Sequence, residues 1–181
     1  MANIPNQIDD YKKRLGLGAR ANLFSVDLTF PSLVGADQDL ENDFKIMCIQ
    51  AGWPALRPVT PIPVPYQGEF FKLPGDKADF ADVTFMFNNS EDYRLRNIFD
   101  TWVQLVNQDR AGVRNNPEDL VTSIFISQLD HARNEIKKVE LIGAWPNSAA
   151  AENAFDRSAD GTISQTSVII SYDWARDVAI V

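Results

Sequence analysis

Two segments of the sequence contain residue types that could bind a cofactor or a metal ion. Residues 16–21 (GLGARA) match a degenerate dinucleotide-binding pattern, but no predicted strand precedes them and no helical pattern follows them. Residues 37–41 (DQDLE) begin like a calcium-binding loop, yet position six is Asn42 instead of glycine and position twelve is Cys48 instead of an acid. We therefore interpret the first segment as part of a tail and the second as a solvated acidic loop.

The other reactive side chains lack the partners that catalysis requires. His131 is the single histidine, it lies in a predicted hairpin turn, and no nucleophile elbow accompanies it. One histidine and one cysteine are too few for a zinc site, and Cys48 alone cannot form an intrachain disulfide. Residues 88–90 (NNS) form a glycosylation sequon, which we interpret as a helix cap because no secretion signal is recognised. The sequence therefore predicts no enzyme, no cofactor and no metal site.

The composition is that of one folded domain of ordinary size. The chain has 181 residues, of which 45% are apolar and 23% are charged. Its 25 acidic and 17 basic side chains give a formal net charge of −8, and such a surface repels nucleic acid. No apolar run is long enough to span a membrane, and the N-terminal segment has no apolar signal core. We expect no membrane anchoring, and folding in a cytoplasm.

Alternation of apolar and polar residues predicts most of the secondary structure. In residues 22–30, for example, Phe24, Val26 and Leu28 share one face. The predicted strands are residues 22–30, 44–49, 67–73, 82–88, 120–129, 135–142 and 165–174, and the last of them turns Val168, Ile170, Tyr172 and Trp174 toward the core.

The predicted fold class is mainly β, with one flanking α-helix. We expect a β-sandwich or barrel of about seven strands, from which a long, extended, proline-rich arm projects. Residues 35–43 form the acidic loop, Trp145-Pro146 ends a hairpin, and residues 147–162 form a second loop. Residues 1–20 are expected to be an N-terminal tail, mobile or ordered by partners and with at most a short helical turn, and residues 21–181 a single domain.

One helix is predicted, over residues 91–107. Asn89 or Ser90 caps its start, and Glu91 follows where the helix dipole favours an acid. Apolar residues recur at spacings of three and four, which indicates one broad apolar face that covers a sheet. The residues expected in the core are Ile98, Phe99, Trp102 and Val106, within a face that also includes Leu95 and Val103.

The proline-rich arm covers residues 53–75, and five of the ten prolines lie between Pro54 and Pro65. Proline fixes φ and removes a backbone donor, so this segment is expected to be stiff and extended, with residues 67–73 returning antiparallel to it. The arm either folds back on its own domain or packs on a neighbouring copy, and we favour the second alternative. The side chains expected at that contact are Val59, Ile62, Val64, Tyr66 and Phe70.

Three segments in register carry a family resemblance. Residues 19–26 (ARANLFSV), 72–77 (KLPGDK) and 139–146 (VELIGAWP), followed by a last strand that ends near residues 172–174 (YDW), resemble the tail tube proteins of contractile-tailed bacteriophages. Tube proteins of related contractile injection systems are similar too. The order and spacing agree over roughly residues 19–175.

The resemblance implies a tail-tube β-barrel domain that forms rings of six copies, and these rings stack into a hollow tube inside a contractile sheath. Sheath, baseplate and tail terminator proteins are the implied partners. DNA, or in related particles a toxin, passes through the lumen without sequence-specific binding. The protein would belong to the virion after assembly in the host cytoplasm. The alternatives are a tube initiator or terminator, an injection-system tube protein, or a monomeric β-sandwich module that binds peptide or carbohydrate.

The wall of such a conduit must be polar, and a sheet whose other face is core provides a polar face by alternation. The alternative is that some of these residues face outer solvent or the sheath. With more acids than bases, we expect the mean field to be negative, so that DNA stays mobile. The residues expected to line the lumen are Gln67, Glu69, Ser123, Ser127, Lys138, Glu140, Ser167, Ser171 and Asp173.

Overall fold

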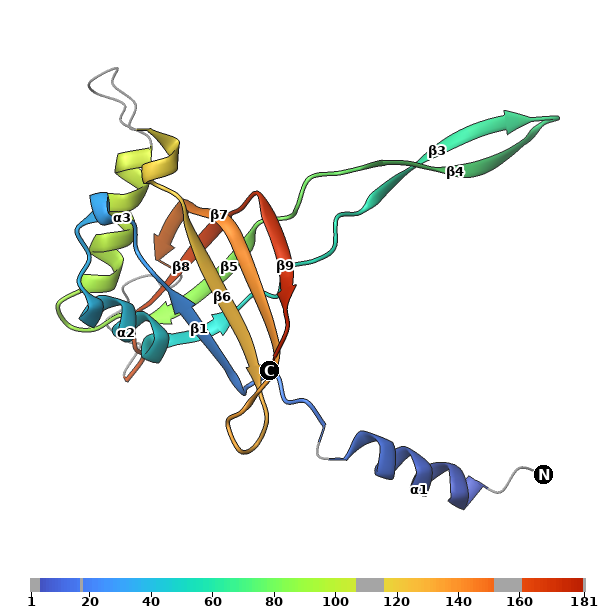
Figure 1. Cartoon of the computed structure of the whole chain (residues 1–181), viewed down its shortest axis with the longest axis horizontal. Helices are drawn as coiled ribbons and strands as arrows, with labels where there is room; N and C mark the ends of the chain where they lie inside the picture. Colours follow the sequence, from blue (N-terminus) through green and yellow to red (C-terminus); the bar gives the residue numbers. More distant parts are fainter. Residues whose placement is uncertain (1–3, 17, 107–115, 152–160, 181) are drawn as a thin grey trace.

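The computed structural model describes residues 4–16, 18–106, 116–151 and 161–180, and most of its regular structure is β (Figure 1). Seven of the nine strands in these residues form one antiparallel sheet, in the order β1-β6-β7-β8-β5-β2 with β9 also paired to β7. The strands are β1 (Phe24–Leu28), β2 (Cys48–Ala51), β3 (Val59–Tyr66), β4 (Glu69–Lys77), β5 (Val83–Asn88), β6 (Thr122–Leu129), β7 (Glu135–Ala151), β8 (Gln165–Ser171) and β9 (Trp174–Val178).

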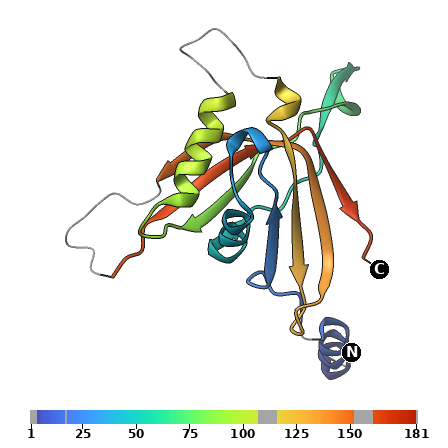
Figure 2. The ribbon, with the colours of Figure 1, turned by 60° about the vertical axis from the view of Figure 1, so that its left-hand side comes forward.

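Strand β7 belongs to two halves of the large sheet. Its first part pairs with β6 and β9, which with β1 form what we call the β9 half. Its second part pairs with β8, which with β5 and β2 forms the β5 half. The halves run in different directions from β7 (Figure 2). Because β1 and β2 end the order without pairing to each other in the described chain, the expected closed barrel is absent.

The long β7 corrects the expectation that Trp145-Pro146 ends the hairpin. The strand continues to Ala151, and the register shifts between Pro146 and Ser148 as it pairs with β8. A bulge tolerates the missing N–H of proline, so the proline does not stop the strand. Gly143 has φ +69 at the change of direction, a conformation that favours glycine.

The last predicted strand, residues 165–174, is two strands. Val168, Ile170 and Tyr172 are buried as expected. The chain then continues along β7 into β9, and between the two strands the backbone N–H of Asp173 donates to the Ile142 carbonyl at 3.1 Å. Trp174, expected in the core, begins β9 and is 52% exposed. The sequence does not mark the boundary between β8 and β9, so the alternation of apolar and polar residues was extended past it to Trp174.

Helix α2 (Gln38–Met47) replaces the acidic loop expected at residues 35–43 and most of the strand expected at residues 44–49. The Asp37 carboxylate accepts a hydrogen bond from the Leu40 backbone N–H at 3.0 Å and caps the helix. Leu40 and Phe44, one turn apart, are buried, whereas Ile46 is 75% exposed. The acids that resembled a calcium loop therefore stand at a helix start, where the helix dipole favours them.

Helix α3 (Arg94–Val106) begins three residues after the predicted start, and the predicted end at residue 107 lies outside the described residues. Phe99 and Trp102 are 1% and 0% exposed, while Ile98 and Val106 are partly buried against the core. The core contains residues of both sheet halves, α2 and α3. It includes an aromatic cluster of Phe30, Phe44, Phe85, Phe87, Phe99 and Trp102.

Three further elements complete the described chain. Helix α1 (Ile4–Leu15) is longer than the single turn expected in the tail, and Ile8, Tyr11 and Leu15 on it are exposed. Two short 3-10 helices are η1 (Ser32–Val34) and η2 (Pro117–Asp119). No helix in the described residues is both long and apolar enough to cross a membrane.

Cys48 should resist alkylation in the folded chain. Burial raises the pKa of its thiol to about 12, and the thiol donates to the Gln50 carbonyl at 3.4 Å. Because the thiolate is the reactive species, iodoacetamide at pH 8 should label Cys48 only after denaturation, as read by mass spectrometry. The double variant Ile46→Cys, Cys48→Ser provides an exposed control that should label at once. Equal labelling of Cys48 in native and denatured protein would contradict its burial.

Candidate functional site

Strands β3 and β4 form a hairpin that extends away from the large sheet (Figure 1). Its loop is Gln67-Gly68, with φ of 49° and 84°, which matches a two-residue hairpin turn. The expected antiparallel pairing of residues 67–73 with the proline-rich segment is present. However, β4 runs on to Lys77, past the end at residue 73 that the sequence predicts.

Both faces of this hairpin carry apolar side chains. Residues paired across an antiparallel ladder point to the same face, so the register defines two faces, which we call the Ile62 face and the Pro63 face. Ile62 is 51% exposed and Phe70, on the opposite face, is 73% exposed. The Ile62 face carries Ile62, Val64, Tyr66, Glu69, Phe71 and Leu73, and the Pro63 face carries Pro61, Pro63, Pro65, Phe70, Lys72 and Pro74.

The residues expected at an inter-subunit contact all belong to this hairpin. Val59 and Tyr66 are 48% and 63% exposed, and Val64 is half-buried. Exposed apolar side chains on two sides of one slender element are unusual for a surface in contact with water only. The hairpin is therefore the strongest candidate for an assembly contact in the described chain.

The root of the hairpin is fixed by Arg57. Its guanidinium carbon lies 4.8 Å from the centroid of the Phe80 ring and 5.4 Å from that of Trp174, and Nη2 lies 3.4 Å from the Asp79 carboxylate. These contacts tie both ends of the hairpin to β9. They also give Trp174 a role outside the core, as part of the hairpin root.

Gly75→Ala should distort the hairpin. A Cβ at Gly75 would collide with the Thr60 carbonyl oxygen and lie 2.8 Å from Ile62 Cγ1, where the register shifts between Val59 and Pro61. Overpacking of this kind costs roughly 1–3 kcal/mol. We expect faster proteolysis within residues 59–77 and an unchanged melting temperature of the large sheet.

The neighbouring variant Asp76→Ala is the matched control, because Asp76 is exposed. It should be cleaved at the wild-type rate. A Gly75→Ala hairpin as resistant to protease as wild type would show that the two strands are not packed as closely as described.

Each half of the large sheet has one face toward the core and an opposite face, which we call its outer face. The outer face of the β9 half carries two rows of side chains across its strands. Ser25, Ser127 and Lys138 align in one row, and Phe125 aligns with Glu140 in the next. Asp27 and Arg176 complete the second row. Four of the residues expected in a lumen, Ser123, Ser127, Lys138 and Glu140, lie on this face.

Charges on this face are paired with each other. The Arg176 Nε donates to the Glu140 carboxylate at 2.6 Å, and Lys138 Nζ donates to Glu135 at 3.1 Å. A hydrogen bond from the Ser127 hydroxyl, and then one from Lys138, lower the pKa of Glu135. Lys45 pairs with Asp27. Three acids and three bases are thus paired here, and Lys45 reaches its partner from α2.

The other residues expected in a lumen lie elsewhere. Gln67 and Glu69 are at the hairpin tip. Ser167 and Ser171 lie on the outer face of the β5 half, where Ile169 and Met86 are neighbours. Asp173 is at the junction between β8 and β9. The structure therefore divides the nine expected residues among the hairpin, two sheet faces and the junction between β8 and β9.

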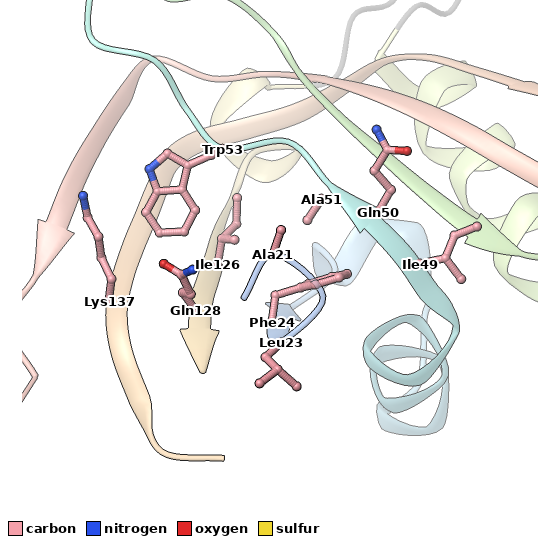
Figure 3. A pocket seen from close by; sticks show the side chains of 10 residues that line it. All are labelled: Ala21, Leu23, Phe24, Ile49, Gln50, Ala51, Trp53, Ile126, Gln128 and Lys137. Atoms are coloured by element: carbon pink, nitrogen blue, oxygen red, sulfur yellow. The ribbon is translucent and has the colours of Figure 1, made fainter. Parts of the chain in front are cut away.

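An apolar cleft of about 530 Å³ lies between β2 and the ends of β1, β6 and β7 (Figure 3). Phe24, Ile49, Trp53 and Ile126 line it, and Lys137 Nζ lies 5.3 Å from the centroid of the Trp53 ring. Its lining in the described chain contains no pair of acids, no histidine and no cysteine. No cluster that could hold a metal ion occurs among the described residues.

Sequence reasoning missed this cleft. Its walls come from segments about 80 residues apart in the chain, near residues 49–53 and 126–128, and periodicity within one segment does not report such a pairing. Only the exposed aromatic Trp53 next to the proline-rich segment was a signal in the sequence.

Known proteins are similar to this chain in sequence and in fold. A tail tube protein of Serratia phage KSP90 is 25% identical over 168 residues, which cover 92% of this chain and 93% of that protein. The fold is similar to a chain in the extended sheath–tube complex of an extracellular contractile injection system, PVC (TM-score 0.60, 15% identity, 94% and 97% of the two chains). It is also similar to a chain in the baseplate of the anti-feeding prophage (TM-score 0.61, 14% identity, 88% and 95%).

The family model described as phage tail tube protein matches residues 19–173. This range includes strands β1 to β8, with the hairpin, α2 and α3, and leaves out α1 and β9. The chain therefore belongs to the phage tail tube protein family, which is structural and not enzymatic.

Proposed function

We propose that six copies of this chain form a ring, that rings stack into a hollow tube inside a contractile sheath, and that DNA is delivered through the lumen. The observation that carries the proposal is the hairpin in a chain of this family. Its two exposed apolar faces stand away from their own domain and need a neighbouring subunit to cover them. Val59, Ile62, Val64, Tyr66 and Phe70 are then buried between subunits.

The partners follow from where similar folds are found. Chains of similar fold occur in a sheath–tube complex, a baseplate and a tube-terminating cap of contractile injection systems. We infer that this chain contacts a sheath protein along the tube, a baseplate protein at one end and a terminator at the other. As a tail tube protein it is a component of the virion. Assembly takes place in the host cytoplasm, without membrane anchoring.

We assign the lumen wall to the outer face of the β9 half. A passage for DNA requires a polar wall that does not bind phosphate strongly, and paired charges with no net excess meet this requirement. The balance of Lys138 with Glu135 and of Arg176 with Glu140 supports this choice. The outer face of the β5 half is less suitable because Ile169 is 36% exposed among its serines.

Negative-stain electron microscopy of the purified full-length chain over a concentration series tests the proposal. Hollow tubes with sixfold end views are the expected result. Single rings that never stack would favour a tube initiator or terminator. A chain that sediments as a monomer at every concentration would contradict assembly and favour a monomeric binding module.

A further inference from the structure

The prolines of β3 occupy every second position, at Pro61, Pro63 and Pro65. In an antiparallel pair, residues that exchange N–H···O bonds with the partner strand alternate with residues whose backbone groups point away. Proline has no N–H to exchange. The three prolines are therefore the outward-pointing residues, and Ile62 and Val64 between them bond to β4.

The turn gives the same assignment independently. Tyr66 and Glu69 flank the two-residue loop, and such a pair is a hydrogen-bonded one. Counting back by two from Tyr66 reaches Val64 and Ile62, so the prolines again point outward.

The outer edge of β3 therefore lacks backbone donors over five residues. An incoming strand needs both donors and acceptors, and this edge offers only carbonyl groups. Proline on an edge strand is one of the ways in which natural sheets prevent strand addition. Edge-to-edge pairing through β3 is thus blocked.

The outer edge of β4 is different. Phe70 and Lys72 lie opposite Pro65 and Pro63, so their backbone N–H and C=O groups also point outward. Among the described strands, β4 pairs with β3 alone. A two-stranded hairpin is marginally stable in water, and a third strand or a covering surface would stabilise it. The edge of β3 thus lacks donors from Pro61 to Pro65, whereas the edge of β4 offers the N–H groups of Phe70 and Lys72.

Charge favours a second copy of this chain as the partner at that edge. Residues 59–77 contain two acids, Glu69 and Asp76, and two bases, Lys72 and Lys77, so the hairpin has no net charge in a chain of formal charge −8. The hairpin is consequently a segment that another acidic copy can approach without repulsion. Its apolar faces would be covered at the same time.

We propose that the outer edge of β4 pairs with an edge strand of a second copy and adds the hairpin to the sheet of that copy. The edge of β3 remains unpaired, so the hairpin docks in one orientation only. This rests on the proposed assembly into a tube, and it names the backbone groups through which the subunits join.

Lys72→Pro and Lys72→Ala form a matched pair that tests the proposal. Both remove the lysine side chain, but only proline removes the outward N–H, and neither affects bonding between β3 and β4. Loss of one hydrogen bond per contact should raise the critical concentration for assembly about fivefold or more in Lys72→Pro. Lys72→Ala should assemble close to the wild-type concentration. Pro63→Ala, across the hairpin, should also leave it unchanged.

Amide hydrogen exchange on the wild-type chain provides a second measurement that does not depend on the folding of a variant. The Phe70 and Lys72 amides should exchange fast in the monomer and slowly in assembled tubes. Unprotected amides in tubes, or equal assembly of Lys72→Pro and Lys72→Ala, would overturn the pairing but not the tube. A wild-type chain that stays monomeric would overturn both.

Discussion

Replacing Trp102 with alanine should lower the free energy of unfolding by about 3–5 kcal/mol. The indole is fully buried, with its ring centroid 5.8 Å from that of Phe30 and 6.1 Å from that of Phe99. Its Nε1–H also donates to the Leu120 carbonyl at 2.8 Å, and truncation leaves this buried acceptor without its donor. A loss of this size is a large part of the stability of an ordinary domain.

Urea denaturation followed by circular dichroism measures the effect. Trp102→Phe keeps an aromatic ring but loses the N–H, so it should fall between wild type and alanine. Gln104→Ala on the exposed side of α3 is the control and should change stability by less than about 0.5 kcal/mol. An unchanged midpoint for Trp102→Ala would mean that α3 does not pack on the sheet as described.

Removing the hairpin should abolish tube assembly and leave a folded monomer. The change deletes residues 59–77 and joins Pro58 to Ala78 through two glycines. The Ala78 N–H already donates to the Pro58 carbonyl at 2.8 Å, so the new connection needs little rearrangement. Since the hairpin side chains are outside the core, the melting temperature of the monomer should stay near that of wild type.

Electron microscopy and sedimentation velocity measure the outcome. Gln67→Asn in the hairpin loop is the control, because asparagine tolerates the positive φ of 49° at this position. This variant should assemble like wild type. Full-length tubes from the deleted chain would show that the hairpin is not an assembly contact.

Elements with one strong period could be predicted from the sequence. The apolar spacing of α3 placed Phe99 and Trp102 in the core, and the alternation in residues 22–30 and 165–174 placed Val26 and Val168 on faces that are buried. The antiparallel return of residues 67–73 on the proline-rich segment was expected, although its loop, Gln67-Gly68, lies inside the strand predicted there. In these cases local pattern and tertiary packing favour the same structure.

Errors arose where two patterns competed over few residues. Phe44, Ile46 and Cys48 alternate as in a strand, but burial of Phe44 one turn after Leu40 favours a helix. Pro146 looks like a strand end, although a bulge accommodates it. The division of the polar residues between two sheet faces depends on the bend of β7. Alternation within a single strand does not reveal which other strands contribute to the same face.

The pairing of β1 with β6 has a consequence for how the chain folds. Phe24 pairs with Gln128, so the first strand of the large sheet bonds to a strand about 100 residues later. Contacts between distant segments form slowly because closing a long loop costs entropy before any contact is made. During synthesis β1 therefore stays unpaired until about two-thirds of the chain, up to β6, has left the ribosome. The segment that becomes the β3–β4 hairpin leaves the ribosome well before that point, so its apolar side chains are exposed to other nascent chains before the domain has closed.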